Sequence, residues 1–139
     1  MPKQIFINFP VKDLKKSMDF YEAIGFTNNP QFTDDTAACM VWSDAIFVML
    51  LTHDKLKQFT SKTIIDAKQA IEVSIALSME SNDEVNAFAE KAVKAGGSEY
   101  AEPADYGFMY QRYVEDLDGH NWEVLYMDMS KFPKQPNGS

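Results

Sequence analysis

The residue in this sequence with the clearest capacity for chemistry is Glu123. It lies between Trp122 and Val124 in an apolar, strand-like segment. Burying an unpaired carboxylate in such surroundings costs free energy, so Glu123 must face a solvated cavity, meet a cation, or have a raised pKa. A carboxylate that faces a cavity could orient a ligand or act as a general base, which typically contributes about 10²–10⁴-fold to a rate. Glu123 is therefore the candidate catalytic residue.

A purely structural role for Glu123 is equally open. Arg112 lies on the preceding strand-like segment, across a short turn, and would form an ion pair with Glu123 if the two side chains shared a face. Strand alternation places Tyr110 and Arg112 on one face of that segment and Gln111 and Tyr113 on the other. The sequence alone does not decide which pair faces inward.

The two histidines and the cysteine do not complete a site around Glu123. His53 follows a strand-like segment and His120 lies beside an Asp-Gly turn, and neither has a second ligand at a metal-binding spacing. We expect both to be structural or exposed. Cys39 lies in an apolar run, which predicts a buried structural thiol, and a single cysteine excludes an intramolecular disulfide or a multi-cysteine zinc site.

Charge and hydropathy exclude several kinds of partner. The net charge of −8 argues against nucleic-acid binding, because phosphates are bound by clustered Lys and Arg. No apolar run approaches the ~20 residues of a membrane-spanning helix. The chain opens in a strand-like segment without the pattern of a signal peptide. We therefore expect a cytoplasmic protein that binds neither nucleic acid nor a membrane.

The elements that position these residues begin with a strand at about residues 4–11. A helix follows, which Asp13 caps and Gly25 ends, because glycine adopts the left-handed conformation that stops a helix. Three further strand-like runs come next, at about residues 26–33, 37–43 and 46–52.

The same order then returns. A strand at about residues 72–78 precedes a helix that opens with the S-x-x-E capping box of Ser81 and Glu84, in which the Glu can bond the amide of the cap residue. The apolar stripe of this helix is Val85, Phe88, Ala89, Ala92 and Val93. Three strands follow, at about residues 98–103, 108–115 and 121–128.

The chain is therefore predicted to contain two β-α-β-β-β units, offset by about 68 residues. We place them at residues 4–52 and 71–128, within one domain of residues 1–130. The connector, residues 53–70, is long for a loop and should hold a short helix or a flap. Residues 131–139 are predicted to be a flexible tail.

Two motifs at the ends of this repeat resemble those of the vicinal oxygen chelate family, the glyoxalase/bleomycin-resistance/dioxygenase type. Residues 11–26 are similar to its opening V-x-D-L-x-x-S-x-x-F-Y-x-x-x-G-F. Residues 115–123 are similar to its closing x-D-P-D-G-x-x-x-E, with Leu117 in place of proline. The resemblance covers residues 4 to 128. It implies an α+β fold of two βαβββ modules that form an open half-barrel around a cavity. It also implies a homodimer, a common state in the family, in which some members exchange modules between chains.

Enzymes of that family hold one divalent metal, with one ligand from the first and one from the last strand of each module. Those positions align with Phe6, Met49 (or its same-face neighbour Phe47), Ser74 and Glu123. Only Glu123 matches the family's ligand pattern, and a catalytic site typically needs three protein ligands. We expect no metal or other cofactor, with a divalent metal held by Glu123 and a histidine as the alternative.

Without a metal, these positions predict the lining of an apolar cavity for a small organic molecule. The candidate ligand-binding residues are Phe6, Asn8, Phe47, Met49, Ser74, Tyr110, Arg112 and Glu123. Family members of the bleomycin-resistance type bind their drug without metal, and a cationic ligand would suit the negative charge. The alternatives are an enzyme of the lyase, isomerase or dioxygenase type, related to lactoylglutathione lyase and using Glu123, and an interaction domain whose barrel is filled by core side chains.

Overall fold

Two modules of β-α-β-β-β order make up residues 3–133, the part of the chain that this computed structural model describes. The first contains β1 (Ile5–Val11), α1 (Leu14–Ala23), β2 (Thr27–Asn29), β3 (Ala37–Val41) and β4 (Ile46–Thr52). Its sheet has the order β1-β4-β3-β2, in which β1 and β4 run parallel and the other pairs antiparallel.

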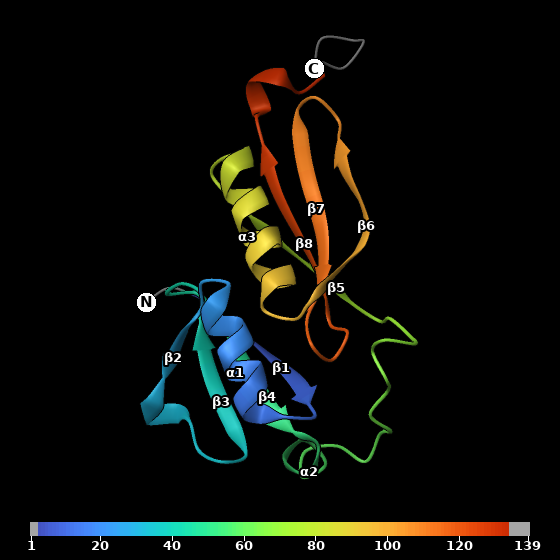
Figure 1. Ribbon diagram of the computed structural model, residues 1–139. Coiled ribbons are helices and arrows are strands. Elements are labelled where there is room, and N and C mark those ends of the chain that lie inside the picture. Colours follow the sequence, from blue (N-terminus) through green and yellow to red (C-terminus); the bar gives the residue numbers. More distant parts are fainter. Residues whose placement is uncertain (1–2, 134–139) are drawn as a thin grey trace.

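The second module repeats this arrangement, which confirms the predicted α+β fold class. It contains β5 (Ser74–Ser78), α3 (Asn82–Lys94), β6 (Ser98–Asp105), β7 (Met109–Glu115) and β8 (Asn121–Met127). Its sheet order is β5-β8-β7-β6, again with the first pair parallel. Figure 1 shows the two modules one above the other, with the connector running beside them from the short helix α2 (His53–Leu56) to β5.

Both helices begin at the expected caps. The Asp13 side chain accepts a hydrogen bond from the Lys16 amide, and Ser81 Oγ accepts one from the Glu84 amide at 3.1 Å. The Glu84 carboxylate bonds the amide of Glu80, at 2.8 Å, and not the predicted amide of Ser81.

Three sequence predictions need correction. The second strand of the first module ends at Asn29, because Pro30 cannot donate to a ladder and opens a 3-10 turn, Pro30–Phe32. Strand β6 continues past Pro103 to Asp105. Val93, placed in the apolar stripe of α3, is 45% exposed, so the buried stripe consists of the other four residues.

The modules share one core, which lies on the helix-covered faces of both sheets. Phe9 from β1 meets Trp122 from β8 edge-on, with ring centroids 5.9 Å apart, and Trp42 meets Phe88 of α3 in the same way. The two sequence motifs also meet here, since Asp118 of the closing motif accepts the Lys12 amide of the opening motif at 3.0 Å. Packing across the junction therefore holds the modules together.

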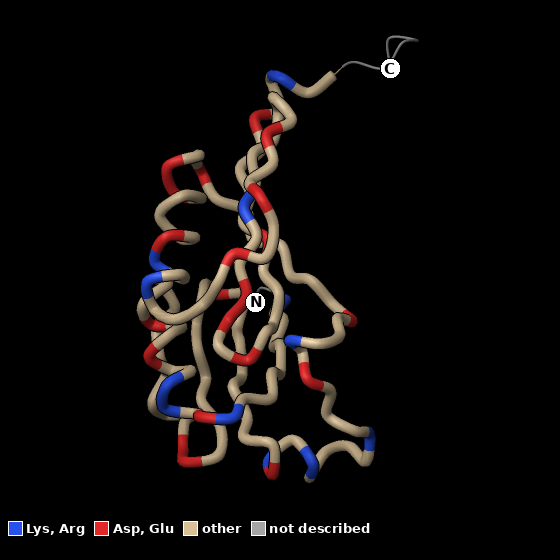
Figure 2. Tube along the Cα trace, turned by 45° about the vertical axis from the view of Figure 1, so that its right-hand side comes forward, with Lys and Arg blue, Asp and Glu red and all other residues tan. Residues whose placement is uncertain are grey.

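Charged residues are interspersed over the surface of the described residues. Figure 2 shows Lys and Arg spread along the helices, the connector and the C-terminal end, with Asp and Glu between them. No helix among residues 3–133 has the length and apolar character needed to cross a membrane. A 3-10 turn, Met129–Lys131, follows β8, and most of the predicted flexible tail lies outside the described residues.

Candidate functional site

Each sheet has one face that no helix covers, and most of the predicted site residues lie on these two faces. On the first sheet, buried Val48 and Leu50 point toward the core, while the alternate residues Phe47 and Met49 are half-exposed. The parallel register of β1 and β4 places Phe6 beside Phe47 and Asn8 beside Met49. Phe6 is 51% exposed, so this face is not a filled core.

The uncovered face of the first sheet contains a broad apolar hollow. Its volume is about 610 Å³, and it is lined by Gln4, Phe6, Asn29, Phe32, Cys39, Phe47 and Met49. The rings of Phe6 and Phe47 stack within it, with centroids 4.5 Å apart and planes inclined by 12°. A flat, apolar ligand could extend this stack, since offset stacking of rings is favourable. Sequence reasoning missed Gln4, Asn29 and Phe32, which come from strand ends and from the turn after β2.

Cys39 is the one thiol of the chain and borders this hollow. Its side chain is buried, as expected, and burial raises the pKa of the Cys39 thiol. A raised pKa keeps the sulfur as a weakly nucleophilic thiol at neutral pH. Cys39 therefore contributes apolar, polarisable surface.

The uncovered face of the second sheet is more polar and contains Glu123. Antiparallel pairing sets Tyr113 directly opposite Glu123 and Gln111 opposite Leu125, so these side chains share one face. Gln111 donates a hydrogen bond to the Tyr113 hydroxyl. Gln111 and Tyr113 are thus the inward-facing pair of β7, a choice that alternation alone left open.

Tyr110 and Arg112 lie on the opposite face of β7, against α3. The Tyr110 hydroxyl donates to Asn86 Oδ1 at 2.7 Å, and Arg112 Nη1 donates to the same oxygen at 3.0 Å. Arg112 Nε donates to Glu99 at 2.8 Å, and the pKa of Arg112 is raised mainly by this bond. The structure therefore separates these two residues from the other candidate ligand-binding residues.

The predicted alternative in which Arg112 neutralises Glu123 is wrong. Arg112 is engaged by Glu99, with Glu90 at 4.0 Å, on the other side of the sheet. Within residues 3–133, no Lys, Arg or His forms an ion pair with Glu123. The half-buried Glu123 carboxylate is therefore left on a solvated face.

The residues present do not fit a divalent metal. Phe6 and Met49 offer no hard donor, the Ser74 hydroxyl is a poor one, and the remaining family ligand position is Glu123. Across the described part of the chain, no three side chains of His, Cys, Asp or Glu gather closely enough to hold an ion.

The two histidines lie at the module junction and not beside Glu123. His120 Nε2 bonds the Pro10 carbonyl at 2.8 Å, and its ring stacks on Phe9 at 4.1 Å. His53 begins α2, and both rings border a small hollow of about 130 Å³ under the connector. His120 therefore has the structural role expected of it.

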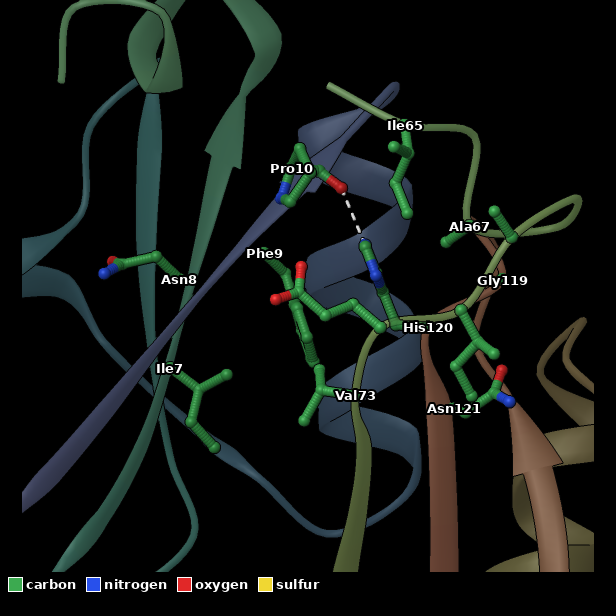
Figure 3. A pocket seen from close by; sticks show the side chains of 13 residues that line it. Ile7, Asn8, Phe9, Pro10, Ile65, Ala67, Val73, Gly119, His120 and Asn121 are labelled. Atoms are coloured by element: carbon green, nitrogen blue, oxygen red, sulfur yellow. Dashed lines mark hydrogen bonds between the residues drawn. The ribbon is translucent and has the colours of Figure 1, made fainter. Parts of the chain in front are cut away.

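A second pocket lies between β1, the connector and the start of β8. Its volume is about 220 Å³, and Figure 3 shows the His120–Pro10 bond on one side, with Ile65 of the connector above the bond and Ala67 beside it. Its walls are mainly apolar, and Glu72 and Asn121 add polar groups. The Asn8 side chain points away from His120 in this view, although Asn8 borders the pocket.

Comparison with known proteins shows that the sequence and the fold are similar to those of one protein superfamily. A sequence model of the Glyoxalase/Bleomycin resistance protein/Dioxygenase superfamily matches residues 3–124. The solved structure of hypothetical protein SA1046 from S. aureus is 30% identical, with a TM-score of 0.76, over 91% of this chain and 95% of that chain. A search of curated proteins found no match.

Two more distant structures share the fold. A glyoxalase-related enzyme from Fulvimarina pelagi is 20% identical, with a TM-score of 0.77, over 100% of this chain and 96% of that one. Fosfomycin resistance protein FosX from Mesorhizobium loti is 17% identical, with a TM-score of 0.67, over 94% and 96%. At these identities the likeness concerns the fold alone.

Proposed function

This chain belongs to the Glyoxalase/Bleomycin resistance protein/Dioxygenase superfamily, and we propose that it binds a small organic molecule against its uncovered sheet faces without a resident metal. The observation that carries the proposal is the hollow of about 610 Å³ around the stacked Phe6 and Phe47 rings. Its size and its mainly apolar lining, with a few polar groups, are typical of small-molecule sites.

The exposed rings supply the driving force for binding. Phe6 is 51% and Phe32 62% exposed, so both rings offer apolar surface that a ligand can cover. Fully burying a Phe side chain contributes roughly 1.5–3 kcal/mol, so a ligand that covers these rings removes a substantial apolar area from water. A binding role like that of the bleomycin resistance proteins accords with this chain's membership of the superfamily that includes them.

We also propose that the protein binds its ligand as a homodimer. The uncovered face of the first sheet carries exposed Phe6 and Phe32, and exposed apolar patches of this kind mark interaction surfaces. A second copy can cover them by placing its own open sheet face opposite. The ligand would then lie between two sheet faces and lose most of its contact with water.

A thermal-shift screen with uncharged aromatic compounds, such as 2-naphthol, tests the binding proposal. A ligand that prefers the native state raises the melting temperature. We expect Phe6→Ala and Phe47→Ala to abolish the shift, and Phe59→Ala, which removes a 67% exposed ring from the connector, to preserve it. Equal responses in all three variants would overturn the proposed location.

Metal analysis tests the second part of the proposal, that the protein holds no resident metal. The alternative is a lyase, isomerase or dioxygenase-type enzyme that uses Glu123 in an irregular metal site. Protein purified without chelator should contain no stoichiometric divalent metal. One equivalent of metal per chain, lost in Glu123→Gln, would establish the metal-dependent alternative and contradict our proposal.

A further inference from the structure

Tyr100 is the extra residue of a β-bulge on the edge strand β6. Glu99 pairs with Val114 and Ala101 pairs with Tyr113, so two steps along β6 match one step along β7. A bulge breaks the regular alternation of side chains and re-aims one of them, and bulges are over-represented beside functional sites. Here it directs the Tyr100 ring toward Tyr113, with ring centroids 5.8 Å apart and planes inclined by 56°.

The two rings and Glu123 form one corner of the open face. Tyr113 lies directly opposite Glu123 in the β7–β8 ladder, and Tyr100 lies beside Tyr113 from the next strand. Burial is the main cause of the raised pKa of each tyrosine. Tyr106 raises the pKa of Tyr113 further, and a bond to Ser74 lowers the pKa of Tyr100. The Glu123 carboxylate makes a smaller contribution that raises both pKa values. Its charge therefore acts on both hydroxyls.

This corner has negative charge and aromatic surface, and within residues 3–133 no Lys, Arg or His forms an ion pair with Glu123. Glu115, on the same face of β7 by alternation, also raises the pKa of Tyr100. Arg112, the basic residue of β7, bonds Glu99 and Asn86 on the reverse face. Tyr100 is 39% exposed, so a ligand can reach its ring.

We propose that Tyr100, Tyr113 and Glu123 form a binding site for an organic ammonium group. Aromatic faces attract such cations within about 6 Å of the ring centroid, and a nearby carboxylate adds Coulomb attraction. An alkylated ammonium suits this corner better than a metal ion, because it needs apolar contact and charge rather than several oxygen ligands. This inference rests on the proposed function, since the ammonium would be the charged end of the ligand whose apolar part contacts the first sheet.

Choline and its uncharged isostere 3,3-dimethyl-1-butanol provide the test, with the full chain and NMR titration. We expect choline to bind at least fivefold more tightly than the alcohol, with an upfield shift of its N-methyl signal from the rings. Glu123→Gln and Tyr113→Leu should each weaken choline binding about three- to tenfold. Tyr100→Leu should do the same, whereas Tyr100→Phe, which keeps the ring, should restore most of the affinity.

Asp83→Asn is the matched control for loss of one negative charge. Asp83 is exposed on α3, which covers the opposite face of the sheet, so this variant should bind choline like the parent protein. Circular dichroism of each variant checks that it is folded. Equal affinity for choline and the alcohol, or equal losses in Asp83→Asn and Glu123→Gln, would overturn the inference.

The test separates this inference from the proposed function. If 2-naphthol binds through Phe6 and Phe47 while choline does not bind, the ammonium site is refuted and the apolar site stands. If choline binds with the expected dependence while 2-naphthol does not, the ammonium site stands and the apolar hollow is not the ligand's main contact.

Discussion

Tyr21 of α1 donates a hydrogen bond of 2.5 Å to the carboxylate of Asp116, which lies between β7 and β8. The hydroxyl of Tyr21 also accepts a bond from Trp122 Nε1 at 3.0 Å. Tyr21 and Asp116 are both buried, and they belong to the opening and closing motifs that bracket the repeat. The two motifs thus form one polar network at the module junction, which is a structural role.

Removing the Tyr21 hydroxyl should destabilise the whole chain. Tyr21→Phe leaves the buried Asp116 carboxylate and the Trp122 N–H without this partner, and an unsatisfied buried group typically costs about 1–3 kcal/mol. We expect urea unfolding to show a loss in this range. Tyr126→Phe, which removes a hydroxyl from a half-buried residue outside this network, is the control and should unfold like the parent protein. Equal losses in both variants would contradict the structural role.

Asp116 should make stability depend on pH. Burial raises the pKa of Asp116 above its ordinary 3.8, while nearby His120 and the bond from Tyr21 oppose the shift. A raised folded-state pKa means that the folded protein binds the proton more tightly. The contribution of this proton to stability is full below pH 3.8 and is lost as the pH rises through the folded-state value.

Asp116→Asn cannot titrate and isolates this effect. The free energy of unfolding of the parent protein, relative to Asp116→Asn, should fall as the pH rises above 3.8. Urea unfolding at a series of pH values measures the difference, in which other titrating groups cancel. Asp44→Asn, at an exposed position, controls for loss of a carboxylate at the surface. A difference that rises with pH would mean that the assigned direction of the shift is wrong.

Arg112 should matter for stability but not for binding on the open faces. Arg112→Met removes its bonds to Glu99 and Asn86, and hydrogen bonds to charged groups contribute about 1.5–3 kcal/mol each before solvent exposure reduces them. We expect a melting temperature several degrees lower and unchanged affinity for choline. Loss of ligand affinity in a folded Arg112→Met protein would show that Arg112 reaches the ligand.

Phe6 should control the oligomeric state. Phe6→Asp places a charge on the apolar face that we propose a second copy covers, so light scattering should show a dimer for the parent protein and a monomer for this variant. Phe59→Asp introduces the same charge on the connector and should remain dimeric. A monomeric parent protein, or a dimeric Phe6→Asp variant, would contradict the proposed dimer.

Local sequence signals were sufficient for the fold because each depends on neighbouring residues. The caps at Asp13 and Ser81, the stop at Gly25 and the alternation of β4 and β8 all determine their elements within a few residues. Repetition of the same order of elements then indicated two similar modules. The early end of β2 shows the limit of this reasoning: the strand-like run continues to Thr33, but Pro30 cannot donate to the ladder and ends the strand at Asn29.

The arrangement of the site depends on contacts between residues far apart in the sequence, and no local sequence pattern contains these contacts. The sequence alone determined that Phe6, Met49 and Ser74 are unsuited to bind a divalent metal and that Glu123 is a carboxylate in an apolar strand. Only the tertiary structure decided that the Arg112 side chain bonds Glu99 on one face of β7, while Glu123 lies opposite Tyr113 on the other face. Alternation limits a strand to two faces, but which face meets a helix is set by packing with α3. The place of Tyr100 depends on a β-bulge, a mismatch between two strands that neither strand shows by itself.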